Sequence, residues 1–231
     1  MIKTVEIFTR KDDMTREEFL AQLHAHAEGA KNIPGIKGYL IDEVIPTVAR
    51  KDIKAFKIPQ LEAIVETYFE DLDALRAVRA TEEMQAFLAA RAPFVGTMKT
   101  LVAVEHVFIP IGEVRPALKN VAFVSRHNGM TVAEFLEEWL VLHGPMALKV
   151  PHLDAFIPNE AIIVLDNPEG CELMDTDYIE GMAFAYFGSV EQEADMVASP
   201  EAKEWFKHGG VNFGRVKGLD AWEKVVIAPQ A

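Results

Sequence analysis

The chain of 231 residues carries 36 acidic and 23 basic side chains, which gives a formal net charge of -13 and a pI of about 5.0. Proteins bind nucleic acids and anionic membranes largely through clustered Lys and Arg, so this balance argues against both partners. Half of the residues are hydrophobic, which is typical of a globular protein with a sizeable core. No apolar run approaches the roughly 18 residues that a membrane-spanning helix needs.

Cys171 is the only cysteine, so the chain cannot form an internal disulfide. This is typical of a protein in a reducing compartment. Residues 1–6 lead directly into a strand pattern, without the apolar stretch and cleavage site of a signal peptide. We therefore predict a cytoplasmic protein.

The first half of the chain alternates strand and helix patterns. Thr15 and Glu18 have the spacing of a capping box, which predicts a helix start, and Leu23 and His26 then lie on one face of that helix. Runs rich in β-branched and aromatic residues predict strands at 3–10, 36–45, 61–69 and 99–109. Helices are predicted at 72–79 and 81–90, and loops at 93–97 and at 46–59, where Lys51, Lys54 and Lys57 occur.

After a linker at residues 112–116 the same order recurs. Thr131 and Glu134 form a second capping box. Ser199 and Pro200 predict another helix start, and His208-Gly209-Gly210 is typical of its C-terminus. Strands are predicted at 120–126, 153–165, 180–187 and 221–227.

The two halves correspond at nearly constant separations. Met14 and Met130 are 116 residues apart, His26 and His143 are 117 apart, and Glu105 and Glu223 are 118 apart. Such constant spacing indicates an internal duplication. Each copy has the order β-α-β-β-α-β, which is typical of a ferredoxin-like fold.

We therefore predict an α+β protein of two ferredoxin-like repeats, residues 1–112 and 117–231. A lone four-stranded sheet with helices on one face leaves its other face bare, and the apolar runs at 39–41 and 161–164 are unsuited to water. Burying apolar surface contributes roughly 25 cal/mol per Å². The two repeats are therefore expected to pack sheet to sheet within the chain.

The stretch from Gly129 to Pro145 resembles the EthD family, a branch of the dimeric α/β-barrel superfamily. The residues that carry the resemblance are Gly129-Met130-Thr131, Glu134-Phe135, Trp139 and His143-Gly144-Pro145, with Arg126-His127 before them and Glu180-Gly181 after them. Because the resemblance covers both halves, it implies a tandem of two EthD-like domains that form an intrachain dimeric α/β barrel. The family includes dehydratases, polyketide cyclases, cofactor-free monooxygenases and muconolactone-type isomerases.

The first copy departs from this pattern. Leu23 stands where the second copy has Trp139, and Ala27-Glu28 stands where it has Gly144-Pro145. We therefore expect the working site in the second half.

His143 is the leading catalytic candidate. It lies four residues after Trp139 on the apolar helix face, where partial burial would keep the imidazole neutral and able to accept a proton. The alternative is a core histidine whose ring is satisfied by a backbone carbonyl. His26 has the matching position, and the structural alternative is stronger there.

Three further residues are candidates for the catalytic group. Glu180 could orient the ring of His143, Tyr186 could donate its phenol to a substrate oxygen, and Arg126 could hold an anionic oxygen. The alternatives are a solvated Glu at a strand end, a core Tyr and a surface Arg. Trp139, Phe135, Phe123, His26 and Tyr68 are predicted to contact the substrate.

The chain lacks HExxH, CxxC and Gly-rich phosphate motifs, so we expect neither a metal nor a cofactor. The predicted function is an acid/base reaction, dehydration, cyclisation or isomerisation, on a small, largely apolar, oxygenated metabolite. One alternative is a small-molecule-binding or accessory protein without catalysis. Another is haem binding, as in distant barrel relatives. A homodimer of the fused unit is also expected.

Overall fold

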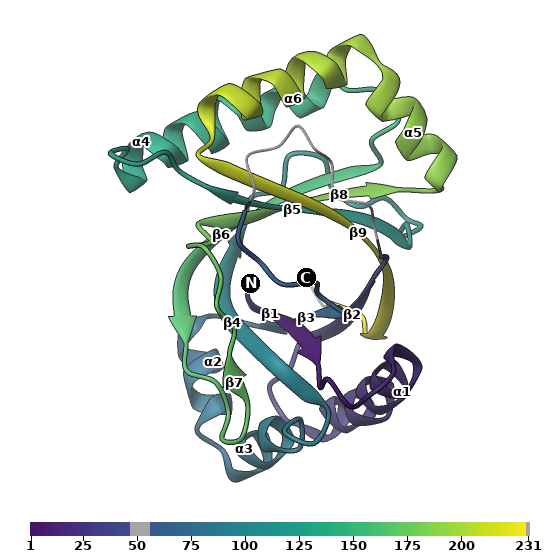
Figure 1. Cartoon of the computed structure of the whole chain (residues 1–231), viewed down its shortest axis with the longest axis vertical. Helices are drawn as coiled ribbons and strands as arrows, with labels where there is room; N and C mark the ends of the chain where they lie inside the picture. Colours follow the sequence, from purple (N-terminus) through teal and green to yellow (C-terminus); the bar gives the residue numbers. More distant parts are fainter. Residues whose placement is uncertain (47–55, 230–231) are drawn as a thin grey trace.

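Eight strands form a closed antiparallel barrel at the centre of the computed structural model, which describes residues 1–46 and 56–229 (Figure 1). The first half of the chain supplies β1 (Ile2–Arg10), β2 (Gly38–Val44), β3 (Ala63–Phe69) and β4 (Val95–Glu105). The second half supplies β5 (Leu118–Ser125), β6 (Ala155–Leu165), β8 (Gly181–Phe187) and β9 (Arg215–Ile227). The short strand β7 (Glu172–Leu173) adds to β4 in parallel.

Each half keeps the strand order of a ferredoxin-like sheet. The first half reads β2-β3-β1-β4, and the second reads β6-β8-β5-β9. The halves join through hydrogen-bonded seams, β2 with β9 and β4 with β6, and these pairings close the barrel. The predicted tandem of ferredoxin-like repeats forming one barrel is therefore confirmed.

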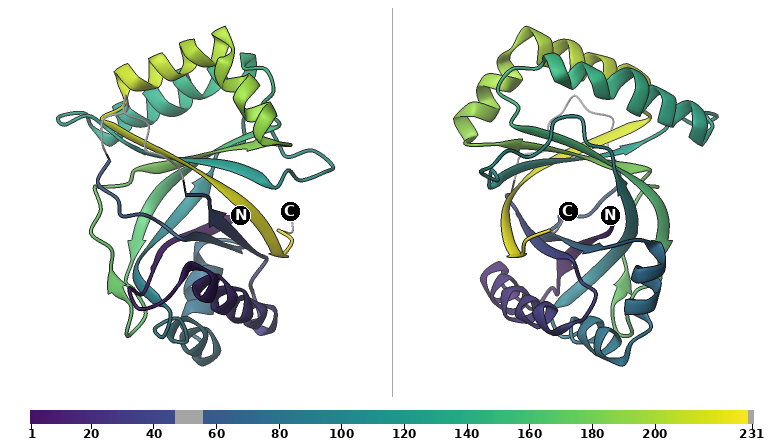
Figure 2. Two further views of the ribbon diagram at one scale, coloured as in Figure 1. Left: turned by 45° about the vertical axis from the view of Figure 1, so that its right-hand side comes forward. Right: turned by 180° about the vertical axis from the view of Figure 1, so that it is seen from behind.

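Helices cover the outer face of each half-barrel (Figures 1 and 2). Beside the first half lie α1 (Arg16–Ala27), the 3-10 helix η1 (Glu28–Asn32), α2 (Leu72–Arg79) and α3 (Glu82–Ala89). Beside the second half lie α4 (Val132–Leu136), the π-helix η2 (Glu137–His143), the 3-10 helix η3 (Gly144–Lys149), α5 (Val190–Ala198) and α6 (Pro200–Asn212). Both predicted capping boxes are present, at Thr15 and Thr131. No helix within the described ranges is long and apolar enough to cross a bilayer.

Several element boundaries differ from the prediction. Strand β4 begins at Val95, inside the predicted loop at 93–97, and β9 begins at Arg215 rather than at 221. Helix α5 was not predicted, although Ser189 caps it. His208-Gly209-Gly210 does not end a helix, because α6 continues to Asn212. Of the lysines in the predicted loop at 46–59, Lys51 and Lys54 lie outside the described residues.

Strand alternation divides the side chains between the barrel interior and the outer face beneath the helices. On β8, Met182, Phe184 and Tyr186 belong to the core inside the barrel. Ala183, Ala185 and Phe187 belong to the layer beneath the helices of the second half. This alternation decides which residues can meet in one site.

The barrel interior also holds a buried charged network, whose centre is the ammonium group of Lys119. Its Nζ lies 2.9 Å from Asp42 Oδ1 and 2.6 Å from Glu223 Oε2, and it also pairs with Glu66. Burial alone would lower the pKa of Lys119, but these carboxylates raise it well above its ordinary value. Burial raises the pKa of Asp42 to about 8 despite the nearby ammonium. On the other side of Glu66, Lys3 Nζ lies 2.6 Å from Oε2.

Candidate functional site

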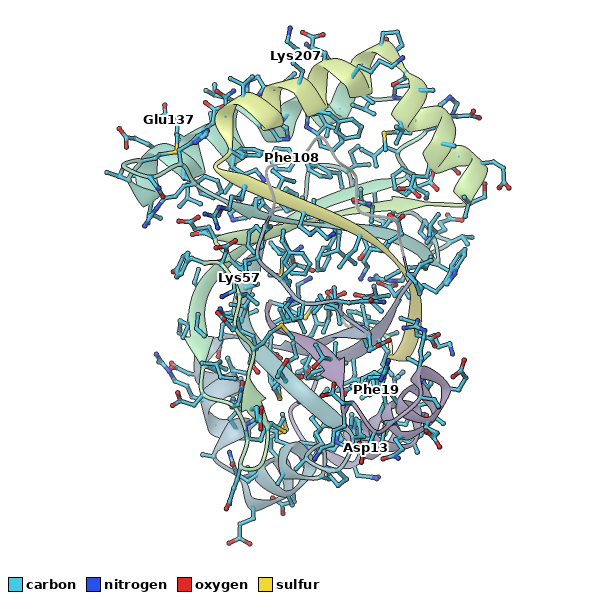
Figure 3. All side chains as sticks on the ribbon, viewed as in Figure 1. Asp13, Phe19, Lys57, Phe108, Glu137 and Lys207 are labelled. Carbon is cyan, nitrogen blue, oxygen red and sulfur yellow. The ribbon has the colours of Figure 1, made fainter. Side chains whose placement is uncertain are left out.

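A cavity of about 840 Å³ lies in the second half, between the outer face of the sheet and the helices α6 and η2. Figure 3 shows the side-chain layer that separates these helices from the barrel, with Phe108 labelled in it. Most of the wall is apolar or aromatic. Among the lining residues are Ala122, Val124, Trp139, His143, Phe156, Ala183, Ala185, Phe187, Met196, Trp205, Gly209, Phe213, Gly218, Asn120 and Asp220.

Small residues of the second half create this space. At the repeat separations of 116 and 118, the position of Glu6 becomes Ala122 and that of Arg91 becomes Gly209. Three more positions also shrink along β8 and β9: Val65 to Ala183, Thr67 to Ala185 and Thr100 to Gly218. The cavity is therefore encoded by a coordinated loss of side-chain volume.

In the first half, a buried ion pair occupies the equivalent space. Arg91 is fully buried, and its NH1 lies 2.6 Å from Glu6 Oε1. The guanidinium carbon lies 5.4 Å from the ring centroids of both Phe8 and Phe87. A buried guanidinium that is paired and flanked by aromatic rings leaves little room for a ligand at this position.

The π-helix η2 places His143 in the cavity wall. A π-helix has more than four residues per turn, so Trp139 and His143, four residues apart, lie on nearly the same side. The ring of His143 stacks on Trp205, with centroids 5.4 Å apart and planes at 23°, and meets the edge of Phe213 at 4.7 Å. Burial lowers the pKa of His143 to about 3, and the nearby His208 acts in the same direction. The imidazole is therefore neutral at physiological pH.

The closest polar partner of His143 is His208, which was not among the predicted site residues. The two Nδ1 atoms are 3.3 Å apart, and His208 Nε2 lies 3.5 Å from Glu138 Oε1. The sequence contained a usable signal, because counting from the helix start at Ser199 places Trp205 and His208 three residues apart on one face. Because the helix was expected to end at His208-Gly209-Gly210, His208 was not considered as part of a helix face.

Glu180 and Arg126 pair with each other, away from His143. Arg126 Nε lies 2.8 Å from Glu180 Oε1, and the backbone N–H of Arg126 donates to Glu180 Oε2 at 2.6 Å. The first half repeats this pair, with Arg10 Nε 3.0 Å from Glu62 Oε1. The expected contact of Glu180 with the imidazole is therefore replaced by a strand-end ion pair common to both repeats. Arg126 and Glu180 line a separate polar depression of about 410 Å³.

Tyr186, Tyr68 and Phe123 face the barrel interior, so they do not contact the cavity beside His143. The Tyr186 hydroxyl lies 3.3 Å from Glu223 Oε2, and the Tyr68 hydroxyl donates to Glu66 Oε2 at 3.0 Å. Phe123 packs in the interior core, whereas its neighbours on β5, 122 and 124, line the cavity. The sheet therefore separates these three predicted side chains from His143.

The remaining predicted residues divide between the two halves. Trp139 lines the cavity, and Phe135 stacks against it with ring centroids 5.5 Å apart. His26 belongs to the filled half, where its Nε2 is 2.8 Å from the carbonyl oxygen of Phe87. Burial lowers the pKa of His26 to about 4, and the charge of Arg91 acts in the same direction. Its position fits the core histidine described as the alternative.

One group of side chains has the composition of a metal site. Oxygen atoms of Asp42, Glu66 and Glu223 lie within 4.8 Å of one another inside the barrel. Lys119 Nζ already lies between these three side chains and supplies a positive charge at this place. A cation at this place would have to displace a fully buried ammonium group.

Comparisons with known proteins support the fold of the whole chain and the family assignment of residues 11–97. Residues 11–97 match the sequence model of the EthD domain, and a search of curated protein sequences gave no significant match. The structure resembles an anthrone oxidase-like protein (12% identity, TM-score 0.66, covering 100% of this chain and 95% of that one). It also resembles a candidate monooxygenase from Lactobacillus acidophilus NCFM (13% identity, TM-score 0.56, covering 98% and 95%). A third similar structure is a candidate monooxygenase from Fusobacterium nucleatum subsp. nucleatum (11% identity, TM-score 0.62, covering 100% and 95%).

These identities establish a shared fold and leave the activity open. The sequence match lies in the first half, where the Glu6–Arg91 pair occupies the inter-layer space. The cavity lies in the second half, whose strands and helix caps follow the same order.

Proposed function

We propose, from the premise that this chain carries an EthD domain, that its second half binds a small, largely apolar, oxygenated molecule and removes a proton from it with His143. The observation that carries the proposal is a neutral, buried imidazole in the wall of a largely apolar cavity. Apolar pockets with a few polar groups are the usual form of small-molecule sites. The proposed family of reactions is dehydration, cyclisation or isomerisation.

The walls favour a flat, ring-containing substrate. Trp205 and Phe213 contact the imidazole, and Trp139 and Phe156 add further aromatic surface to the cavity wall. A planar molecule can stack against such surface. Further along the cavity, Asn120 and Asp220 supply polar atoms that could hold a substrate hydroxyl or carbonyl.

His143 would act on a proton next to a carbonyl or a similar activating group. Proton removal leaves the electron pair on the substrate as an enolate-like species, and return of the proton elsewhere completes an isomerisation or expels a hydroxyl as water. In this proposal Glu180, Arg126 and Tyr186 have structural roles, because they lie in the strand-end pair and in the barrel interior.

A probe that needs only a base in an apolar pocket tests the proposal. 5-Nitrobenzisoxazole is small, aromatic and oxygenated, and removal of its ring proton opens the N–O bond to give a coloured nitrophenolate. A positioned general base contributes on the order of 10²-fold or more, so His143→Ala should lose about that factor. Binding is followed separately through fluorescence of Trp139 and Trp205, which line the cavity.

His26→Ala is the matched control, because it removes the equivalent imidazole from the filled half. It should leave both binding and the rate unchanged. Equal rates for wild type and His143→Ala, with the probe bound to both, would favour the non-catalytic binding protein. Failure of the probe to bind to the wild type would contradict the assignment of the cavity as a site for small aromatic molecules.

A second candidate reaction follows from the names of the similar structures, an anthrone oxidase-like protein and two candidate monooxygenases. A carbanion formed by His143 could be trapped by O₂ instead of a proton, and anthrone plus O₂ would then give anthraquinone and water. Oxygen uptake with anthrone, compared between wild type and His143→Ala, distinguishes this reaction from isomerisation.

The predicted haem-binding alternative is tested by the Soret absorbance of the purified protein after addition of haemin. The predicted homodimer is tested by sedimentation.

A further inference from the structure

We propose that His208 and Glu138 form a proton relay, which fixes the tautomer of His143 and receives positive charge when His143 removes a proton. The proposal rests on the base role given above to His143. In it His208 and Glu138 are positioning residues that act through the catalytic imidazole.

The three side chains form a path from the cavity to the surface. His143 Nδ1 lies 3.3 Å from His208 Nδ1, and His208 Nε2 lies 3.5 Å from Glu138 Oε1. His143 is only 7% exposed, whereas the side chains of His208 and Glu138 are 29% and 17% exposed. Asn212, one turn further along α6, places its Nδ2 3.3 Å from Nδ1 and 3.4 Å from Nε2 of the same ring. The path connects a buried base with a partly hydrated acceptor.

The carboxylate sets the direction of the hydrogen bonds. Glu138 Oε1 is buried without a hydrogen-bond partner among the described residues and lies 3.5 Å from His208 Nε2, so its negative charge favours the tautomer of His208 that carries the proton on Nε2 and leaves Nδ1 as an acceptor. His143 must then donate Nδ1–H to His208. This leaves His143 Nε2 unprotonated in a ring that lines the cavity. The same logic fixes the reactive nitrogen in carboxylate–histidine pairs of hydrolases.

The relay removes the main weakness of a buried base. A positive charge confined to His143 would be poorly solvated, which is why burial lowers its pKa to about 3. In the relay the substrate C–H bond breaks, its electron pair remains on the substrate, and the proton bonds to His143 Nε2. At the same time the Nδ1 proton of His143 passes to Nδ1 of His208, so the positive charge lies beside Glu138. His143 stays neutral and can return its Nε2 proton to the product.

The equivalent positions of the first repeat carry neither a histidine nor a carboxylate. At the repeat separations of 118 and 116, Ala90 corresponds to His208 and Gln22 to Glu138. His26 is held there through its other nitrogen, Nε2, which bonds to the backbone carbonyl of Phe87. The relay therefore accompanies the cavity and is absent from the half in which that space is filled.

Nitrogen NMR of the full-length protein with ¹⁵N-labelled histidine tests the relay without any substrate. The expected spectrum shows His143, assigned by its loss in His143→Ala, as the Nδ1–H tautomer with a bare Nε2. His208→Gln retains an acceptor oxygen but cannot take a proton. It should preserve this tautomer and lower the rate with 5-nitrobenzisoxazole at least about tenfold. His208→Phe removes the acceptor, so His143 should no longer be held as the Nδ1–H tautomer, and the rate should fall as well.

Glu138→Gln should shift the nitrogen signals of His208 and lower the probe rate. Glu137→Gln is its matched control, since it removes the same charge from the preceding residue. Glu137 is exposed and lies at the outer edge of the helical layer (Figure 3). A wild-type spectrum with His143 as the Nε2–H tautomer would overturn the relay. So would Glu138 and His208 variants that match the wild type in both spectrum and rate.

The two proposals fail in different ways. If His143→Ala abolishes the probe reaction while the relay variants do not affect it, the base role stands and the relay is wrong. If His143→Ala leaves the reaction unchanged, the proposed function is wrong, and the tautomer measurement still decides whether the hydrogen-bonded path exists.

Discussion

The contact of Trp139 with Gly181 gives a quantitative prediction for the architecture of the second half. A Cβ atom added at Gly181 would lie 2.1 Å from Trp139 Cη2, 2.3 Å from Cζ3 and 2.8 Å from the Asn159 carbonyl oxygen. Ordinary contacts begin near 3.4 Å, so Gly181→Ala requires the indole to move by more than about 1 Å. Trp139 is 1% exposed and stacked on Phe135, which restricts that movement.

Overpacking of this kind costs about 1–3 kcal/mol, and the rigid surroundings favour the upper end. For a chain of this size we expect a fall in Tm of roughly 6–12 °C for Gly181→Ala. In the first half, Leu23 stands at the position of Trp139 and Ala63 at that of Gly181, and both lie in one core cluster. The smaller Leu side chain leaves room for the Cβ atom of Ala63. Trp139→Leu combined with Gly181→Ala should therefore cost less than the sum of the single changes, by at least about 1 kcal/mol.

Urea unfolding followed by circular dichroism measures the three free energies without relying on the tryptophan that is removed. If the loss of stability in the double variant equals the sum of the two single losses to within about 0.5 kcal/mol, the two positions are not coupled. That result would refute the proposal that the Leu–Ala pair can replace the Trp–Gly pair at this contact. A neutral Gly181→Ala would refute the contact itself.

Three further predictions concern other parts of the chain. Glu6→Ala should destabilise by about 3–5 kcal/mol in urea unfolding, because it leaves the guanidinium of Arg91 buried without its carboxylate, and Arg91→Met added to it should recover part of that loss. The raised pKa of Asp42, about 8 in the folded state, means that the folded protein holds a proton there which the unfolded chain releases near pH 4. This contribution to stability is therefore full below pH 4 and is lost as pH rises through 8, so Asp42→Asn should make the stability difference between pH 6 and pH 9 smaller. Thr131→Ala removes the cap that accepts from the backbone N–H of Glu134 and should cost about 1 kcal/mol, and an unchanged urea midpoint would contradict that role.

Much of the architecture could be predicted from local chemistry and repetition. Capping boxes have a fixed spacing, so Thr15 and Thr131 located two helix starts correctly. The constant separation between the halves predicted their shared strand order, and the family resemblance implied its closure into a barrel. Both signals are carried by residues close in sequence or by simple counting.

The site was harder to predict because it depends on which face of each strand points inward. Aromatic side chains such as Tyr186 and Phe123 would suit either face of the sheet. Only the closed barrel shows that these two face its interior. The contribution of Ala122 and Gly209 was also hidden. Small residues carry no chemistry of their own, and their meaning appears only beside Glu6 and Arg91 in the other repeat.

His208 illustrates a different limit. Two consecutive glycines usually favour a helix end, yet Gly209 is kept inside α6 because a Cβ there would lie 3.0 Å from His143 Cε1 and 3.2 Å from the ring of Phe213. The helix tolerates glycine at this position since the imidazole needs the room. Tertiary packing overrides local preference here, and a single sequence does not reveal that packing.

The two hydrogen-bonded seams that join the halves within one chain have a consequence for how such a protein can change. In a barrel assembled from two identical chains, every substitution appears in both subunits, so filling one pocket fills the other. Covalent fusion removes that constraint, since β2 with β9 and β4 with β6 hold together two sequences that can diverge. One repeat can then become a solid support, locked by the Glu6–Arg91 pair, while its partner is hollowed by glycine and alanine at a cost to its own packing. The asymmetry between the halves is in this sense a division of labour between rigidity and access.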